Sequence, residues 1–394
     1  MRKQLLVPLS ILSFLILATI IVVLFGKGYR LNFEQGKPDL SGTGLLVVTS
    51  IPDGAQVFIN DHLTTATDNT INLAPKSYKV KIVKEGYFPW EKTLVIKSEV
   101  VAKADALLFP SAPKLESITN TGVESPVMDP TQTKLAFTVA TPSATRKKGI
   151  YVLDMSTRPI LTLQGASTQI ADDSIGLFSK AKLSWSPDGS QIIATTSGQT
   201  TYLLDAKSFN QNPQDVTETM ATVNTTWEKQ QEEKQKAQMD TLSKKLKLFV
   251  SNFSILSWSI DETKILYKAN VDAELPIVID PRLIGANSTP EQRFIKEGSV
   301  YVYDTKEDRN YKILDAMPED KKQLAWFPDS KHLIYVHTQK VDIMEYDGLN
   351  QTTVYAGPFV DSYVFPWPDG SKIVILTNLG NRDTASNLYT IGLK

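Results

Sequence analysis

The chain has 394 residues, of which 42% are hydrophobic and 22% are charged, close to the averages of globular proteins. Lys and Arg number 42 and Asp and Glu number 43, so the formal net charge is −1 and no basic excess indicates nucleic-acid binding. Cysteine is absent and histidine occurs three times, which excludes disulfides, cysteine-ligated metals and a cysteine nucleophile. The composition favours a non-enzymatic protein of two to three domains.

The first predicted element is an apolar run at residues 5–25, which follows a short tail of residues 1–4. Its 21 residues carry no charge, and a helix of this length spans about 30 Å, the thickness of a hydrocarbon core. A secretory signal peptide has an apolar region of only about 7–15 residues followed by a small-residue cleavage site. This run is longer and has no such site, so we expect an uncleaved transmembrane helix that acts as a signal-anchor.

Basic residues flank this run on both sides, with Arg2 and Lys3 before it and Lys27 and Arg30 after it. The positive-inside count is therefore close to a tie, but long domains translocate largely regardless of charge. We predict a single-pass protein of the cytoplasmic membrane with its N-terminus inside and its C-terminal domains extracytoplasmic.

Residues 26–43 are rich in Gly and polar residues, which is typical of a linker. A β domain is then predicted at residues 44–110, because apolar, β-branched or alternating segments are separated by turn signals. The predicted strands are residues 45–49, 56–60, 77–83, 92–96 and 100–108.

A tetrapeptide turn, Pro52-Asp53-Gly54-Ala55, stands inside a wider pattern in this domain. The pattern consists of Ser50, Val57-Phe58-Ile59-Asn60, Leu73-Ala74-Pro75, Tyr78 and Lys84-Glu85-Gly86-Tyr87. On these residues the domain resembles the PEGA family, with Asp53 in place of the usual Glu and Lys76 in place of a common Gly. The resemblance implies a small β-sandwich outside the cytoplasmic membrane that is non-catalytic and mediates surface contacts. The tetrapeptide itself is interpreted as a structural turn.

A repeated unit fills residues 115–394: an apolar or aromatic strand, a tight turn, an apolar strand and an aromatic strand that often ends in Asp. Its equivalent turn positions are Pro130, Pro187, Ile260, Pro328 and Pro368, separated by 57, 73, 68 and 40 residues. The shortest interval matches one four-stranded blade of about 40–45 residues. We therefore predict an all-β fold whose C-terminal part is a β-propeller of five blades, and the longer intervals leave room for a sixth.

The repeats resemble the W-S-P-D-G-S/T blade motif of TolB-like and WD-type propellers. The motif residues, expected to be structural, are Trp185, Pro187, Asp188, Gly189, Trp258, Asp261, Trp326, Pro328, Asp329, Trp367, Pro368, Asp369 and Gly370. The aspartates suit turn hydrogen bonding, although carboxylates could also line a calcium site. The tryptophans suit packing between blades, and the alternative is a set that stacks on carbohydrate.

Two insertions interrupt the repeats. Residues 224–248 predict one helix, with a capping box at Thr225 and Glu228 and a narrow apolar stripe. It packs against its own propeller or acts as a partner-binding or dimerising arm, and its candidate interaction residues are Trp227, Met239, Leu242 and Leu246. Acidic residues interleave with its lysines, which disfavours nucleic acid. Residues 271–298 predict a long loop or an extended hairpin over one propeller face, a common place for recognition.

No catalytic, cofactor-binding or metal site is expected: the sequence has no G-x-S-x-G and no phosphate-binding glycine pattern. His62, His332 and His337 are interpreted as surface or strand-packing residues. The leading hypothesis is a membrane-anchored, extracytoplasmic, non-catalytic scaffold that binds cell-envelope polysaccharide or protein. The alternatives are a glycan-active enzyme with its site at the propeller mouth and an oligomeric assembly protein that uses the 224–248 helix. The sequence does not predict the oligomeric state.

Overall fold

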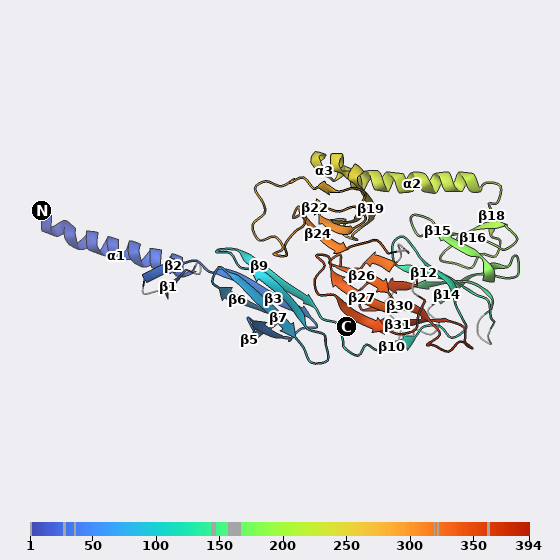
Figure 1. Ribbon diagram of the computed structural model, residues 1–394, viewed down its shortest axis with the longest axis horizontal. Helices are drawn as coiled ribbons and strands as arrows, with labels where there is room; N and C mark the ends of the chain where they lie inside the picture. Colours follow the sequence, from blue (N-terminus) through green and yellow to red (C-terminus); the bar gives the residue numbers. More distant parts are fainter. Residues whose placement is uncertain are drawn as a thin grey trace. The chain divides into compact units, whose positions relative to one another are not determined.

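The computed structural model describes residues 2–26, 29–34, 37–142, 147–156, 167–318, 320, 323–360 and 363–394. The chain divides into two compact units: Met1–Leu108 with Ile279–Pro290 (unit 1), and Phe109–Val278 with Glu291–Lys394 (unit 2). Strands dominate both units, and the α-helices of the described residues are α1, α2 and α3 (Figure 1). The predicted all-β fold class, with an N-terminal apolar helix, is confirmed.

Helix α1 covers Arg2–Gly26. It begins before the predicted start at residue 5, because Arg2, Lys3 and Gln4 are good helix formers that extend the apolar segment. Within it, the 19 residues Pro8–Gly26 are long and apolar enough to cross a membrane by length and composition, and none of the residues in this apolar window is buried.

A two-stranded hairpin stands where the sequence predicted an irregular linker. Strands β1 (Arg30–Glu34) and β2 (Lys37–Ser41) pair antiparallel, with Arg30 opposite Ser41. The prediction gave weight to Gly and Pro and missed the alternation of Leu31 and Phe33 with polar residues, which is a strand signal. Residues 27, 28, 35 and 36 of the predicted linker lie outside the described residues.

The rest of unit 1 is a sandwich of two sheets. One sheet has the order β6-β3-β9, with β3 (Gly44–Ile51), β6 (Asn69–Leu73) and β9 (Val101–Leu107). The other has the order β5-β4-β7-β8, with β4 (Gln56–Ile59), β5 (His62–Ala66), β7 (Ser77–Val83) and β8 (Trp90–Val95). Strands β5 and β6 were not predicted, because their Thr- and Asn-rich sequences carry few apolar residues.

Alternation along these strands makes the core of the sandwich. Leu46 and Val48 of β3, Val80 and Ile82 of β7 and Trp90 of β8 belong to one buried cluster between the two sheets. The residues between them point outward, as expected where one face of each sheet is buried. The first and last strands of the sandwich, β3 and β9, are parallel neighbours in the same sheet. In that sheet β3 is the central strand and β9 is an edge strand.

Unit 2 contains five four-stranded antiparallel sheets among its described residues, and we number them as blades. Blade 1 contains β11 (Glu124–Met128), β12 (Lys134–Val139), β13 (Gly149–Asp154) and β14 (Ser167–Asp172). Blade 2 contains β15 (Lys182–Trp185), β16 (Gln191–Thr195), β17 (Thr201–Asp205) and β18 (Gln214–Asp215). Blade 3 contains β19 (Phe253–Trp258), β20 (Lys264–Ala269), β23 (Val300–Asp304) and β24 (Arg309–Leu314).

Blade 4 contains β25 (Leu324–Trp326), β26 (His332–His337), β27 (Lys340–Glu345) and β28 (Thr352–Ala356). Blade 5 contains β29 (Val364–Pro366), β30 (Lys372–Thr377), β31 (Asn387–Gly392) and β10 (Leu115–Ser117). Strand β10 comes from the start of unit 2 and pairs antiparallel with β31, so that Leu115 lies opposite Ile391. Blade 5 is thus built from both ends of the unit.

Apolar side chains on opposite faces of the sheets join neighbouring blades. One buried cluster joins blade 5 to blade 1, a second joins blade 1 to blade 2 and a third joins blade 3 to blade 4. In blade 4, the Phe327 ring lies against Gly370 of blade 5, where a Cβ atom would be 3.0 Å from the ring. The blades therefore follow one another in the order 3, 4, 5, 1, 2.

Helices, and not another blade, cover the remaining face of blade 3. Leu242 and Leu246 pack there with Tyr267 and Tyr301. The predicted single helix is in fact two, α2 (Met220–Asp240) and α3 (Lys244–Phe249), because Ser243 caps α3 by accepting a hydrogen bond from the Leu246 N–H. The expected capping box is wrong: α2 begins five residues before Thr225, whose hydroxyl donates to the Ala221 carbonyl inside the helix (2.9 Å).

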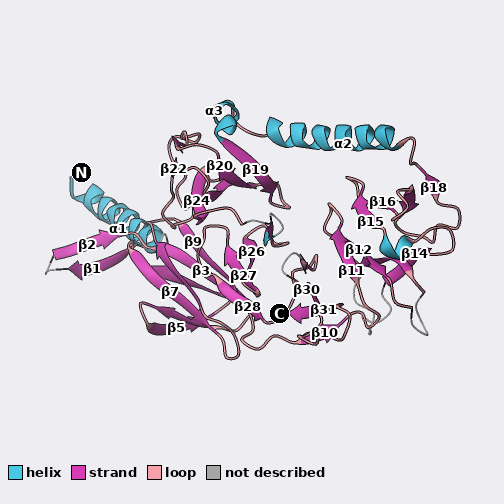
Figure 2. Cartoon of the chain, turned by 45° about the vertical axis from the view of Figure 1, so that its right-hand side comes forward, coloured by secondary structure: helices cyan, strands magenta, loops and turns pink. Residues whose placement is uncertain are grey.

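Helix α2 runs along the chain from β18 of blade 2 toward α3 on blade 3 (Figure 2). Residues 228–237 are all exposed, which is nearly three turns without a buried side chain. Near its C-terminal end the helix meets blade 3, where the Gln238 amide donates to the Glu262 carboxylate (2.9 Å). A helix that is polar all round in its middle is typical of a solvated span between two packed ends.

The predicted loop at residues 271–298 is divided between the two units. Its ends form a short pair, β21 (Ala273–Glu274) and β22 (Phe294–Ile295), beside blade 3. Its middle, Ile279–Pro290, belongs to unit 1, where the Ser288 hydroxyl accepts from the backbone N–H of Val95 in the edge strand β8 (3.1 Å). The expectation of a loop over a propeller face is therefore corrected for this middle part, which covers a sheet edge of the sandwich.

A buried ion-pair network fixes the ends of that loop to blade 3. The Arg293 guanidinium donates to the carboxylates of Asp308 and Glu291, both at 2.8 Å. It also donates to the backbone oxygens of Leu275 and Pro276 (3.1 and 2.6 Å). Because Arg can make five such bonds in fixed directions, one side chain holds both arms of the loop and the turn before β24.

Candidate functional site

The repeated turns use their aspartates internally. Each blade has a turn end, where its first strand passes into its second, and a loop end opposite. At the turn end of blade 2, Asp188 accepts from the hydroxyl of Ser186 (2.6 Å) and the N–H of Ser190 (3.0 Å), which lowers the pKa of its carboxyl. Asp261 accepts in the same way from Ser259 and Thr263, and Asp369 accepts from the Ser371 N–H (2.8 Å).

The remaining turn residues supply backbone shape. Gly189 and Gly370 have φ of +67° and +66°, a region in which side chains are strained. Pro187, Pro328 and Pro368 precede the aspartates in their turns. The described residues contain no group of three His, Asp or Glu side chains that could hold a metal ion, and each motif aspartate is bound within its own turn.

The four motif tryptophans lie in four different clusters. Trp367 packs between blades 5 and 1, Trp185 between blades 1 and 2, and Trp326 between blades 3 and 4, while Trp258 borders the cluster on the helix-covered face of blade 3. The Trp185 indole N–H donates to the Val127 carbonyl of the neighbouring blade (2.9 Å). The structure therefore does not bring the tryptophans together as one stacking surface.

Two of the histidines pair with aspartates in blade 4, His332 with the exposed Asp329 and His337 with the buried Asp342. His332 Nδ1 lies 2.6 Å from Asp329 Oδ2, and His337 Nε2 lies 2.9 Å from Asp342 Oδ2. Burial of Asp342 opposes its ionisation, but hydrogen bonds from His337, Gln351 and Thr353 outweigh burial and hold the pKa of its carboxyl below the usual value. The third, His62, contacts the Asn60 carbonyl oxygen through Nδ1 (2.8 Å).

The carboxyl groups also bear on the enzyme alternative. Glycan hydrolysis uses an acid whose pKa is raised. Several described aspartates and glutamates instead have a carboxyl pKa that is shifted downward by hydrogen bonds or neighbouring cations. These residues are Glu116, Asp172, Asp188, Asp205, Asp215, Asp261, Asp315, Asp329, Asp342 and Asp369.

In unit 1, the tetrapeptide Pro52-Asp53-Gly54-Ala55 forms a turn between β3 and β4. Gly54 has φ of +68° and Ala55 is fully buried. The Thr67 hydroxyl accepts from the Ala55 N–H (2.9 Å), and the Lys84 ammonium donates to the Asp53 carbonyl (2.6 Å). The Asp53 carbonyl and the Ala55 N–H are thus both used inside the sandwich.

The candidate interaction helix needs correction in part. Leu242 and Leu246 are only 6% and 2% exposed, so they are core residues of blade 3 and not a surface for a partner. Met239 and Trp227 are half-buried. The exposed part of the insertion is the polar middle of α2, residues 228–237. None of the four predicted residues lies in it, and Trp227 directly precedes it.

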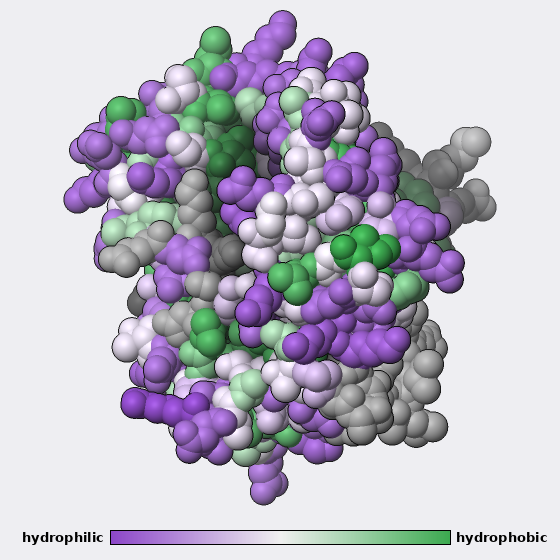
Figure 3. Space-filling model, turned by 90° about the vertical axis from the view of Figure 1, so that its right-hand side faces the viewer, coloured by the Kyte–Doolittle hydropathy of each residue, from purple (hydrophilic) through white to green (hydrophobic). Residues whose placement is uncertain are grey.

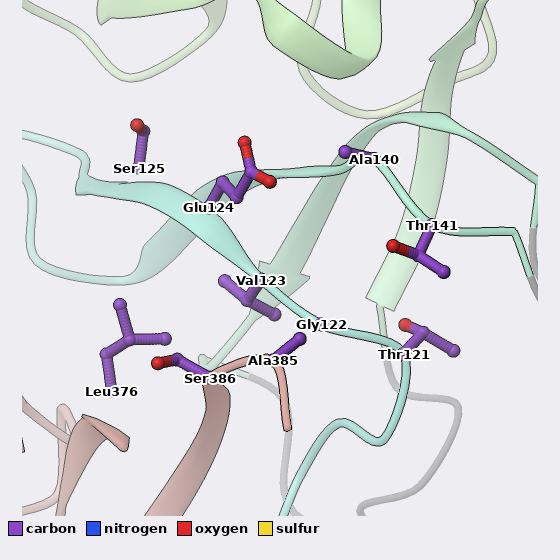
Figure 4. A pocket seen from close by; sticks show the side chains of 10 residues that line it. All are labelled: Thr121, Gly122, Val123, Glu124, Ser125, Ala140, Thr141, Leu376, Ala385 and Ser386. Atoms are coloured by element: carbon purple, nitrogen blue, oxygen red, sulfur yellow. The ribbon is translucent and has the colours of Figure 1, made fainter. Parts of the chain in front are cut away.

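A pocket of about 400 Å³ lies at the loop ends of blades 1 and 5 (Figure 4). Its walls come from the residues that enter β11, from those after β12 and from the adjoining ends of β30 and β31. The lining residues are Thr121, Gly122, Val123, Glu124, Ser125, Ala140, Thr141, Leu376, Ala385 and Ser386. Its volume is in the range of small-molecule sites.

Asn387 fixes the segment that forms one wall of the pocket. Its side-chain oxygen accepts from the Thr119 hydroxyl (3.1 Å) and the Gly122 N–H (3.0 Å). Gly122 has φ of +80°, and a Cβ atom there would lie 2.9 Å from the Ala385 Cβ. Only glycine fits this close approach, so Gly122 brings the two walls together.

The strand beside the pocket is irregular. The pairing of β11 with β12 shifts register between Glu124 and Val127, and Ser125 has φ of +47°. A bulge that carries a residue in this strained region re-aims neighbouring side chains and is often found beside binding sites. Glu124 is exposed and is the charged side chain among the described lining residues.

Thr121 carries the strongest sign of a missing partner. The residue is 9% exposed, and its hydroxyl oxygen is buried without a hydrogen-bond partner among the described atoms. Such an unsatisfied group costs about 1–3 kcal/mol. Sequence reasoning missed this site because residues 121 and 386 are far apart in the chain, and only the pairing of β10 with β31 brings them together. Gly122 is the available sequence signal, and a lone glycine does not distinguish a turn from a close approach between two segments.

Comparison with known proteins identifies the class of the first module. Residues 43–111 match the PEGA domain family, as the motif in residues 50–87 predicted. The match covers the sandwich of unit 1 and does not include the blades. No curated protein matches the sequence.

Solved structures with β-propellers are similar to the chain. They include a TolB-type protein of Agrobacterium tumefaciens, with 13% identity, a TM-score of 0.23, and coverage of 69% of this chain and 80% of that one. TolB from Acinetobacter baumannii shows 15% identity and a TM-score of 0.23, with 81% of this chain and 61% of that chain covered. The Cps50 propeller of Myceliophteria thermophila shows 9% identity and a TM-score of 0.26, with 72% and 100% covered. The blade assignment here depends on strand pairing and not on these likenesses.

Proposed function

We propose that this protein is a single-pass membrane protein that holds its PEGA domain and propeller outside the cytoplasmic membrane. It serves there as a non-catalytic scaffold that binds cell-envelope polysaccharide or protein. The observation that carries the proposal is α1. A helix with Leu12, Phe14 and Val22 all more than half exposed requires an apolar surrounding, and hydrocarbon supplies it.

Two further observations support a binding role. The PEGA match at residues 43–111 adds a module of the kind that mediates surface contacts. The face of the molecule in Figure 3 is mostly hydrophilic, with apolar side chains in small separate groups. A surface of this kind suits a water-exposed domain on a membrane tether more than a domain buried in an obligate complex.

The absence of cysteine makes the location easy to test, because any introduced cysteine is the sole thiol. We expect a membrane-impermeant maleimide to label Lys236→Cys, on the exposed middle of α2, in intact cells whose outer layers admit the reagent. The matched control is Ile16→Cys inside the apolar helix, which lipid shields from the reagent. Labelling of Lys236→Cys only after the membrane is disrupted would place the propeller in the cytoplasm and overturn the proposal.

A further inference from the structure

The pocket at the loop ends of blades 1 and 5 has a built polar wall. Thr121 is more than nine-tenths buried, and its hydroxyl oxygen has no partner among the described atoms. Figure 4 shows the side chains of Thr121 and Thr141 on one side of the pocket and those of Ser125 and Ser386 on the other. Glu124 lies between these groups along the upper wall of the view.

These side chains define the chemistry of an occupant. A hydroxyl can donate one hydrogen bond and accept two, whereas an ionised carboxylate only accepts. An ammonium group has no acceptor and leaves the hydroxyl hydrogens unsatisfied. A ligand that both donates and accepts at several adjacent positions satisfies the whole wall, and a sugar ring carries such groups on neighbouring carbons.

The rest of the lining selects among sugars. Val123, Ala140, Leu376 and Ala385 supply apolar surface against which the C–H groups of a sugar ring pack. The Glu124 carboxylate repels an acidic sugar and attracts an amine. The volume of about 400 Å³ accommodates one or two rings.

We propose that this pocket binds a neutral or amine-bearing hexose unit at the end of a glycan chain. The proposal rests on the proposed scaffold function and names the ligand class for it. The same chemistry is offered by a polysaccharide, a glycolipid or a glycosylated protein, and binding to free oligosaccharides of defined composition separates the sugar from its carrier.

The test is a calorimetric titration of the full chain, solubilised in detergent. The titrants are oligosaccharides of glucose, of glucosamine and of glucuronate. We expect saturable binding of the first two and at least tenfold weaker binding of the acidic series. Thr121→Val removes the hydroxyl with little change in shape and is expected to weaken neutral-sugar binding about fivefold or more. Its unfolding temperature stays at or above that of the parent, because the lost hydroxyl had no partner.

Glu124→Gln separates charge from shape. It is expected to weaken glucosamine binding about tenfold while glucose binding changes less than twofold. Thr225→Val and Glu228→Gln on α2 are matched controls that leave all affinities unchanged. The pocket assignment is overturned if none of the sugars shows saturable binding. It is also overturned if Thr121→Val binds neutral sugars with the same affinity as the parent. That outcome leaves the scaffold function standing, whereas maleimide labelling from the cytoplasmic side alone removes the scaffold function and not the sugar site.

Discussion

At the turn ends of the blades, the carboxylates of Asp188, Asp261 and Asp369 accept hydrogen bonds from within their own turns. At the loop end of blades 1 and 5, the Thr121 hydroxyl is buried without a partner among the described atoms. The repeated aspartates therefore make hydrogen bonds that stabilise the fold. The Thr121 hydroxyl, which has no partner among the described atoms, lies in a segment that does not repeat. The difference indicates that a ligand site in this propeller is to be sought in its irregular loops and not in its motif.

The variant expected to have the largest effect is Asp308→Ala, in the turn between β23 and β24. It tests whether polar groups at the turn ends of the blades stabilise the fold. Asp308 is fully buried and accepts from Arg293 and from the Tyr303 hydroxyl (2.8 Å each). Its removal leaves the Arg293 guanidinium without this counter-charge, so we expect a loss of about 3–5 kcal/mol in the free energy of unfolding. Urea denaturation followed by tryptophan fluorescence measures it.

The matched control for Asp308 is the double variant Arg293→Met with Asp308→Leu. Replacing both charges by apolar side chains avoids the unpaired guanidinium, so this variant is expected to lose less than Asp308→Ala alone. If Asp308→Ala is as stable as the parent, the polar groups at the turn ends of the blades do not stabilise the fold. The contrast between the turn ends and the loop ends is then wrong.

Leu246→Ala tests whether the helical insertion serves the blade or a partner. Leu246 is 2% exposed among the tyrosines of blade 3, and such truncations cost about 2–5 kcal/mol. Leu248→Ala, two residues along the same helix and 83% exposed, is expected to cost less than about 0.5 kcal/mol. Thermal unfolding of both variants decides it: equal, small effects would mean that α3 is not part of the core.

Acid is expected to have a smaller and graded effect on blade 4. Burial opposes ionisation of Asp329, but His332 and the backbone N–H groups of residues 331 and 332 outweigh burial and hold its pKa below the usual value of about 4. A carboxyl with a lowered pKa in the folded state contributes stability above its unfolded pKa and loses it as the pH falls through the folded one. The contribution of the Asp329 carboxylate to the free energy of unfolding should therefore be constant from pH 7 to about 5 and should fall below about pH 4.

The variants Asp329→Asn and Asp342→Asn check that assignment. Each is expected to be less stable than the parent at pH 7 and to show a shallower loss between pH 5 and 3, measured as the urea midpoint at each pH. Parallel pH curves for parent and variants would show that other carboxyl groups govern the acid response.

Much of the fold was predictable because its signals are local. The spacing of Pro187, Ile260, Pro328 and Pro368 predicted the blades, since each turn needs its own Pro, Asp or Gly regardless of the rest of the chain. The 73-residue interval before Ile260 holds helices α2 and α3 in place of a sixth sheet among the described residues. Strands β5 and β6 were missed because partners within the sandwich, and not their own polar sequences, hold them extended.

The pocket could not be predicted, because its walls depend on contacts between distant segments. Asn387 joins Thr119 and Gly122 across more than 260 positions, and no periodicity marks such a pair. Likewise, the apolar stripe through Leu242 and Leu246 indicated a helix face, but sequence alone could not distinguish a face that meets blade 3 from one that meets another protein.

The pairing of β10 with β31 has a consequence for the time course of synthesis. Leu115 leaves the ribosome 276 positions (391 − 115) before its partner Ile391, an interval of roughly 15–55 seconds at about 5–20 residues per second. Until β31 has been synthesised, β10 has no strand to pair with, because β31 is its neighbour in blade 5. The blade that closes the unit is thus the last to form, so a chain cut short before β31 leaves its first strand permanently unpaired.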